Sequence, residues 1–147
     1  MNAIETIQLA KTVDRPAIIQ LLNSLQLPTV DLPLVLDSFV VAKQQETLLG
    51  SCGLELYGTL ALLRSLAVAL HHQDQGLGAA LLQATLDLAK TRGIKGVYLI
   101  TNTAANFFEK RGFAPVERSR VPLAIQQTAQ FGSVCPSSAT VMCRSIF

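Results

Sequence analysis

The chain has 147 residues, of which 50% are hydrophobic and 15% are charged, a size and composition typical of one globular domain with a real core. The 12 Lys and Arg residues stand against 10 Asp and Glu for a net charge of +2, and they are scattered without interleaved aromatic residues, which argues against nucleic-acid binding. No apolar run approaches the roughly 20 residues that span a membrane, and the amino terminus lacks the features of a signal peptide, so we expect a cytoplasmic protein.

The first part of the chain predicts a strand, a helix and a connector. Ile4 to Lys11 alternates as in a half-buried or edge strand. Asp14 is then expected to cap a helix that carries Pro16 in its first turn. The connector that follows holds two prolines, and Leu34 to Asp37 is expected to add a short helix.

The middle of the chain reads as an antiparallel meander. Ser38 to Lys43 and Thr47 to Tyr57 flank a short polar turn, and Gly58-Thr59 leads into the apolar run Leu60 to Val68. An amphipathic helix follows, and then the buried strand Gly96 to Thr101. Because a helix connects them, these last two strands should be parallel neighbours.

Further along, Asn102 to Arg111 predicts a short helix stopped by Gly112, and Phe113 to Val116 continues as extended chain. The elements together predict an α/β (α+β) fold with a mixed, mostly antiparallel sheet and one parallel pair of strands. We expect residues 1–147 to form a single domain.

A glycine loop, Gln73 to Ala80, stands at the head of the amphipathic helix. Gly76 and Gly78 would let a backbone approach a ligand, and the amide groups of the first helical turn could hold a phosphate or pyrophosphate. A tight turn between strand and helix would need the same glycines. A P-loop and a Rossmann loop are both excluded, because Ala79-Ala80 and Leu81 stand where Lys-Ser/Thr and a third glycine would be required.

The pattern Gln/Arg-x-x-Gly-x-Gly/Ala after a buried strand resembles the coenzyme A loop of the GNAT family of N-acetyltransferases. Residues 105–113, Ala-Asn-Phe-Phe-Glu-Lys-Arg-Gly-Phe, resemble the second motif of that family. The resemblance implies the GNAT fold and acetyl-CoA as the acetyl donor, with no metal. In the family the loop amides hold the pyrophosphate, and the preceding strand pairs with the pantetheine arm. The residues to which the resemblance gives CoA contacts are Leu66, Ala67, Val68, Gln73, Asp74, Gln75, Gly76, Leu77, Gly78, Ala79, Ala80, Asn102, Asn106, Phe108 and Arg111.

One position departs from the family pattern. Many members carry a tyrosine at the position of Phe108, where its hydroxyl protonates the departing thiolate, and phenylalanine has no such proton. Water or another residue must then donate the proton to the departing thiolate. A non-catalytic module that binds or senses acyl-CoA is therefore the alternative to an enzyme.

The run Arg64 to Val68 and parts of the tail, including Val121-Pro122 and Met142, resemble small acetyltransferases encoded with arsenic-resistance genes. These are similar to the catalytic domain of N-acetylglutamate synthases. The resemblance implies a small-molecule amine acceptor, an amino acid or a glutamate-like analogue. It also implies that the tail covers the acceptor pocket and supplies a last strand, which is a candidate for pairing in a homodimer.

Two charged residues are candidates for catalysis. Glu55 lies where the acceptor amine of the family usually enters and could act as a general base, although an exposed glutamate at a strand end is the alternative. The same two alternatives, a catalytic and a non-catalytic role, apply to Tyr57. Arg64, in an otherwise apolar strand, predicts either a bidentate clamp for a substrate carboxylate or a structural pair with a nearby acid.

The histidine and cysteine residues predict no metal site. His71 and His72 are adjacent loop residues that we expect to be solvated, and Cys52, Cys135 and Cys143 lack Cys-x-x-Cys spacing. We expect buried reduced thiols, with Cys135 in a structural or pocket-lining role rather than a covalent one.

Overall fold

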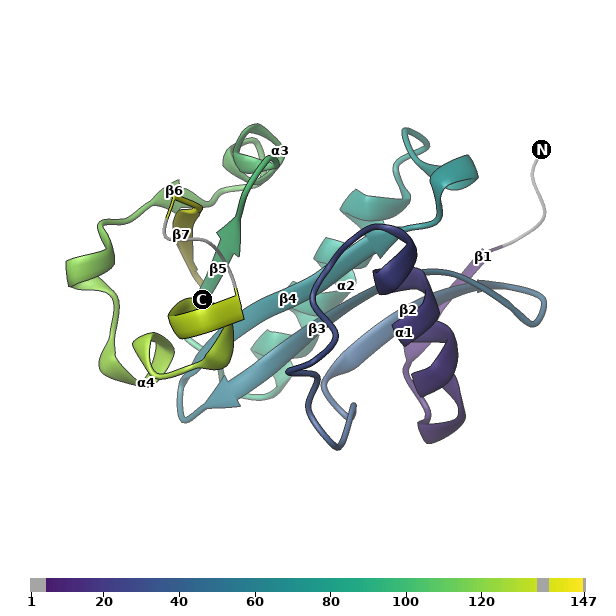
Figure 1. Cartoon of the computed structure of the whole chain (residues 1–147), viewed down its shortest axis with the longest axis horizontal. Helices are drawn as coiled ribbons and strands as arrows, with labels where there is room; N and C mark the ends of the chain where they lie inside the picture. Colours follow the sequence, from purple (N-terminus) through teal and green to yellow (C-terminus); the bar gives the residue numbers. More distant parts are fainter. Residues whose placement is uncertain (1–4, 135–137, 147) are drawn as a thin grey trace. The chain divides into compact units, whose positions relative to one another are not determined.

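The computed structural model describes residues 5–134 and 138–146. The strands form one mixed, seven-stranded sheet in the order β1-β2-β3-β4-β5-β7-β6 (Figure 1). The chain divides into two compact units, Met1–Leu54 with Ser65–Leu88 and Glu55–Arg64 with Ala89–Phe147. The strands β3 (Thr47–Tyr57) and β4 (Leu60–Val68) each contribute residues to both units.

The first unit contains β1 (Glu5–Leu9), α1 (Arg15–Ser24) and β2 (Phe39–Gln44), with most of β3 and of α2 (Leu77–Thr91). β2 pairs antiparallel with β1 on one side and with β3 on the other, and its pairing with β3 confirms that part of the predicted meander. β1 is the outer strand of the sheet, as its alternating sequence indicated.

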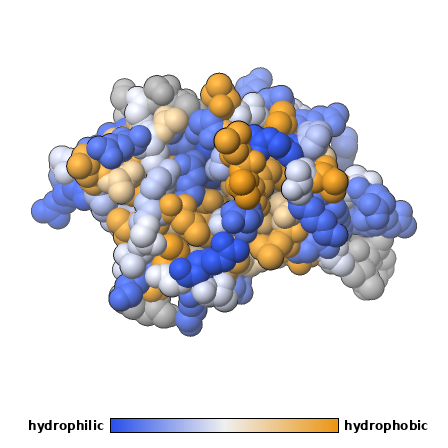
Figure 2. Space-filling view, turned by 90° about the horizontal axis from the view of Figure 1, so that it is seen from below, coloured by the Kyte–Doolittle hydropathy of each residue, from blue (hydrophilic) through white to orange (hydrophobic). Residues whose placement is uncertain are grey.

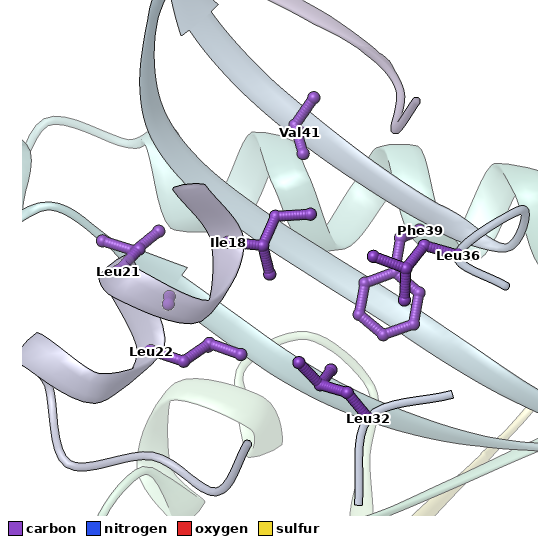
Figure 3. Packing of buried hydrophobic residues seen from close by; sticks show 8 residues of the cluster. Ile18, Leu21, Leu22, Leu32, Leu36, Phe39 and Val41 are labelled. Carbon is purple, nitrogen blue, oxygen red and sulfur yellow. The ribbon is translucent and has the colours of Figure 1, made fainter. Parts of the chain in front are cut away.

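Helices cover both faces of this first unit. In Figure 1, α1 lies in front of β2, and α2 passes behind the strands. Because side chains alternate along a strand, Phe39 and Val41 of β2 point to the α1 side. There they pack with apolar residues of α1 and of the connector after it (Figure 3). On the other side, Cys52 of β3 is hydrogen bonded with Thr85 of α2, and both residues are fully buried.

The second unit contains β5 (Gly96–Thr101), α3 (Ala105–Glu109), β6 (Ala114–Pro115), α4 (Leu123–Gln126) and β7 (Thr140–Ser145). β5 runs parallel to β4, with Leu60 opposite Gly96, as the connecting helix predicted. The core cluster of this unit joins the sheet to the segment after β6. Its buried members are Leu62, Val121, Ile125 and Val141, and its partly buried neighbours are Tyr57, Leu60, Tyr98, Ile100, Val116 and Phe131.

Two predictions about the tail had different outcomes. The tail does supply the last strand, β7, but β7 lies between β5 and β6 and is not an edge. The tail strand is therefore not the outer strand of the sheet, and its role in a homodimer stays a prediction. The outer strand on this side is β6, which has two residues and includes Pro115, whose nitrogen cannot donate a hydrogen bond.

Three expectations for local structure are corrected. Residues 34–37 form bends and turns and no helix; the Arg15 guanidinium donates to the carbonyls of Pro33, over 2.6 Å, and Leu34, over 3.4 Å. Asp14 precedes α1 without capping it, because its carboxylate accepts the Lys11 N–H and forms an ion pair with Lys43. Helix α3 is shorter than the predicted span.

The ends of three helices share one hydrogen-bonding pattern. After α2, Gly93 donates to the Lys90 carbonyl and Ile94 to the Ala89 carbonyl, and Gly93 has a φ of 75°. This is the Schellman arrangement, which requires a left-handed residue. The second family motif ends α3 in the same way at Gly112, whereas α1 ends with Gln26 in the left-handed position.

Hydrophobic and hydrophilic residues are interspersed on the face shown in Figure 2. None of the helices within the described residues is both long and apolar enough to cross a membrane. Among the described residues, the large hydrophobic side chains that are exposed are Leu9, Val13, Val30, Leu34, Val35, Leu56, Leu70 and Leu123.

Candidate functional site

The glycine loop follows β4 in the first unit. A short turn, Leu70–His72, precedes it, and the Gln73 side chain donates to the Val68 carbonyl over 3.0 Å. Asp74 and Gly76 both have positive φ angles, of 62° and 84°. The loop is thus wound back against the end of the strand that precedes it.

Gly76 leaves the space that a ligand would need. A Cβ atom built there would meet no atom of the described residues within 4 Å, its chain neighbours excepted. Ala80 donates its N–H to the Gly76 carbonyl over 3.1 Å. The amides just before Ala80 belong to the first turn of a 15-residue helix, where N–H groups lack acceptors within the helix. These donors and the helix dipole fit a phosphate or pyrophosphate group.

The other loop positions are compatible with ligand contact. Gln73, Asp74, Gln75 and Gly76 are exposed, whereas Leu77 is 7% exposed and anchors the start of α2. The remaining predicted contacts of the loop are exposed or half-buried, namely Gly78, Ala79 and Ala80.

β4 is irregular just before the residues predicted to pair with the pantetheine arm. Ser65 has a φ of 59°, which is uncommon for a residue other than glycine. Its carbonyl accepts a hydrogen bond of 2.8 Å from the Ser51 hydroxyl. Beyond it, Leu66 and Val68 are half-buried and Ala67 is buried. No feature of the sequence signals this irregularity, because serine has no marked preference for positive φ.

A polar cluster in the second unit contains both predicted catalytic residues. Arg64 donates to Oε2 of Glu55 over 2.6 Å, and the Tyr57 hydroxyl donates to Oε1 of the same carboxylate. The Arg64 side chain is fully buried, and that of Glu55 is 14% exposed. The structural pair that the sequence left open is therefore present, and Tyr57 is a third member that sequence reasoning did not assign.

The four predicted CoA contacts in the second motif differ in how far they are exposed. Asn102 and Asn106 are exposed and Arg111 is half-buried. Phe108 is 5% exposed, since its ring packs edge-on against Phe107 and Phe113. Phe108 therefore closes the end of α3 with an apolar contact.

Arg111 is held by its own helix. Its guanidinium lies 3.9 Å above the centre of the Phe107 ring and donates to the Phe107 carbonyl over 2.8 Å. Arg144 of β7 donates in turn to the Arg111 carbonyl over 2.7 Å. The contacts with Phe107 fix the direction of the Arg111 side chain, and the contact from Arg144 holds its backbone.

The cysteine and histidine residues differ in exposure. Burial raises the pKa of the Cys52 thiol to about 12, so this thiol stays protonated at neutral pH. Cys143 is free and half-buried rather than fully buried, and Cys135 lies outside the described residues. His71 is exposed and His72 half-buried. Within residues 5–134 and 138–146, His, Cys, Asp and Glu side chains form no group of three that could hold a metal ion.

Known proteins resemble the chain both in sequence and in fold. The chain is 24% identical to the amino-acid acetyltransferase of Pasteurella multocida over 131 residues, which are 83% of this chain and 30% of that protein. The N-acetylglutamate synthase of Neisseria gonorrhoeae, solved with coenzyme A and N-acetyl-glutamate, has a TM-score of 0.85 at 20% identity and covers 100% of this chain. This chain covers 36% of that synthase.

A relative of similar length has the same fold. Rv2747 from Mycobacterium tuberculosis, solved in complex with CoA and NLQ, has a TM-score of 0.78 at 20% identity, over 97% of this chain and 99% of its own. The model of the acetyltransferase (GNAT) domain matches residues 36–115, which are more than half of the chain and include the glycine loop and the second motif. The chain therefore belongs to the GNAT family of acetyltransferases.

Proposed function

We propose that the chain is an acetyl-CoA-dependent N-acetyltransferase that acts on the amino group of a small molecule. The observation that carries the proposal is the glycine loop, in which an open Gly76 and the first-turn amides of α2 could hold a pyrophosphate. The residues with proposed CoA contacts are those named from the sequence, in the loop, at Leu66 to Val68 and in the second motif.

The proposed mechanism is direct attack by the acceptor amine in a ternary complex. When bound, acetyl-CoA supplies the acetyl group as a thioester. Glu55 takes a proton from the acceptor ammonium, so that the neutral nitrogen can attack. The proton for the leaving thiolate comes from water, because Phe108 has none to give and its ring is buried against its neighbours.

We propose an amino acid, with a preference for glutamate-like compounds, as the acceptor. Support comes from the names of the relatives, an amino-acid acetyltransferase and an N-acetylglutamate synthase. Arg64 would bind the acceptor carboxylate. Since Arg64 is fully buried and donates to Glu55, we propose that the acceptor carboxylate replaces Glu55 at the guanidinium.

Four further parts of the proposal come from the sequence. They are a cytoplasmic location, a role in arsenic resistance, a single domain over residues 1–147 and a homodimer. With β7 inside the sheet, a dimer formed by strand pairing would use β1, since β6 has only two residues.

A screen of acceptors tests the proposal. The wild-type chain is incubated with acetyl-CoA and with glutamate, its phosphinic and arsenical analogues, and neutral and basic amino acids, and the release of free thiol is followed. We expect turnover with at least one α-amino acid and faster turnover with acidic ones. Binding of acetyl-CoA without turnover on any acceptor would favour the non-catalytic sensor.

A further inference from the structure

Both oxygen atoms of the Glu55 carboxylate are engaged by side chains of the same unit. Oε1 accepts the Tyr57 hydroxyl, and Oε2 accepts Arg64 over 2.6 Å. Two donors on different oxygens fix both the position of a carboxylate and its rotation about the last side-chain bond. Glu55 is thus held more firmly than a glutamate at the end of an exposed strand would be.

Tyr57 is built into the sheet in a way that keeps its hydroxyl in place. It stands two residues after Glu55 in β3, so both side chains lie on the same face. Its ring is partly buried against the core cluster that includes Leu62 and Ile125. A ring anchored by apolar packing has little freedom, and its hydroxyl therefore stays directed at Glu55.

We propose that Tyr57 is a positioning residue for Glu55, a role that rests on the proposed function of Glu55 as the base. The Tyr57 hydrogen bond to Oε1 holds the carboxylate plane in one orientation, and with it the remaining lone pairs that could accept the proton of the acceptor ammonium. Tyr57 also remains a partner of Glu55 when the carboxylate of an acidic acceptor takes the place of Glu55 at Arg64. The base then keeps its orientation while the acceptor is bound.

The kinetic test compares Tyr57→Phe with Tyr98→Phe. Both changes remove one hydroxyl, and both rings pack against the same apolar cluster. We expect Tyr57→Phe to lower kcat about tenfold to a hundredfold, the range for a hydrogen bond to a charged group, while the KM for acetyl-CoA stays within about twofold. Tyr98→Phe should keep kcat within about twofold.

A double-mutant cycle shows whether Tyr57 acts through Glu55. If it does, Tyr57→Phe should cost almost nothing further in a chain that already carries Glu55→Gln. An equal loss of kcat in both backgrounds, or an unchanged kcat after Tyr57→Phe, would overturn the proposal. Absence of turnover in the wild type would instead remove the proposed function and leave the contact to be judged spectroscopically.

The spectroscopic test needs neither turnover nor a change at Tyr57. The chain contains two tyrosines and no tryptophan, so Tyr98→Phe leaves Tyr57 as the single source of a phenolate absorbance signal. A phenol that donates to an anionic carboxylate is harder to ionise. Adding Glu55→Gln should therefore move the midpoint of the absorbance change to lower pH. An unmoved midpoint would show that the hydroxyl does not donate to Glu55 in solution.

Discussion

Replacing Gly76 by leucine should weaken acetyl-CoA binding much more than it weakens the fold. A Cβ at this position meets no atom of the described residues within 4 Å, so the new side chain starts into open space, in the place assigned to the pyrophosphate. The control is Gly93→Leu, near the other end of α2. Gly93 also has a positive φ, of 75° against 84°, and a Cβ there likewise meets no atom of the described residues within 4 Å.

The two substitutions should therefore cost the same stability. A leucine held in the left-handed region costs about 1–2 kcal/mol. For a chain of this length that lowers the melting temperature by about 2–8 °C. Only Gly76→Leu also removes charge-assisted hydrogen bonds to the ligand, each worth roughly 1.5–3 kcal/mol, which corresponds to a loss of affinity of about tenfold to a hundredfold.

Calorimetric titration with acetyl-CoA and thermal unfolding measure the two effects separately. We expect similar melting temperatures for the two variants and weaker binding only for Gly76→Leu. Equal affinities in the two variants would refute the reasoning and leave Gly76 as a residue of a tight turn.

Three further predictions concern Arg64, Asp14 and Gln26. Arg64→Ala should slow turnover of acidic acceptors about tenfold to a hundredfold and leave the affinity for acetyl-CoA unchanged. An equal loss of turnover for every acceptor, together with a lower melting temperature, would mean that Arg64 serves only as the partner of Glu55. Burial acts to raise the pKa of Asp14, but hydrogen bonds and charge attraction from Lys43 and Lys11 outweigh it, so this pKa lies below its usual 3.8. Asp14→Asn should thus lower the unfolding free energy above pH 3.8, and denaturant titrations should show the difference from wild type shrinking as the pH falls below 3.8 and through the lowered pKa. Gln26→Gly should raise the unfolding free energy by about 1 kcal/mol, because Gln26 has a φ of 58°; unchanged thermal unfolding would count against this.

The elements with strong local patterns were predictable from the sequence. The apolar run of β4, the amphipathic α2 and the buried β5 lie close together in the chain, and a connecting helix allows essentially one arrangement of the two strands. Gly93 and Gly112 marked the ends of their helices, because glycine is the residue best suited to the left-handed position.

Features that depend on distant residues were not predictable. The position of β7 between β5 and β6 is set by pairing across the sheet, which the local pattern of the tail does not encode. The Leu34 to Asp37 segment was expected to be a short helix, but it forms bends and turns, and Arg15 donates to the carbonyls of Pro33 and Leu34.

Part of the candidate site was predictable from the sequence, and part was not. The glycine loop could be found from spacing alone, whereas the pairing of Arg64 with Glu55 could be seen only in the structure, and the clamp role of Arg64 stays a prediction. Tyr57 could have been grouped with Glu55, because residues two apart in a strand share a face, but sequence does not show where a hydroxyl points.

The transfer of an acetyl group to an α-amine is the central claim, and following the acetyl group itself tests it most directly. Acetyl-CoA with an isotopic label in its acetyl group is incubated with the wild-type chain and glutamate, and the products are separated and analysed by mass spectrometry. We predict that the label appears in an amide on the α-nitrogen of glutamate, in step with the release of free CoA. Label that remains in acetyl-CoA, or that appears only as acetate, with glutamate and with every other amino acid tried, would contradict the account.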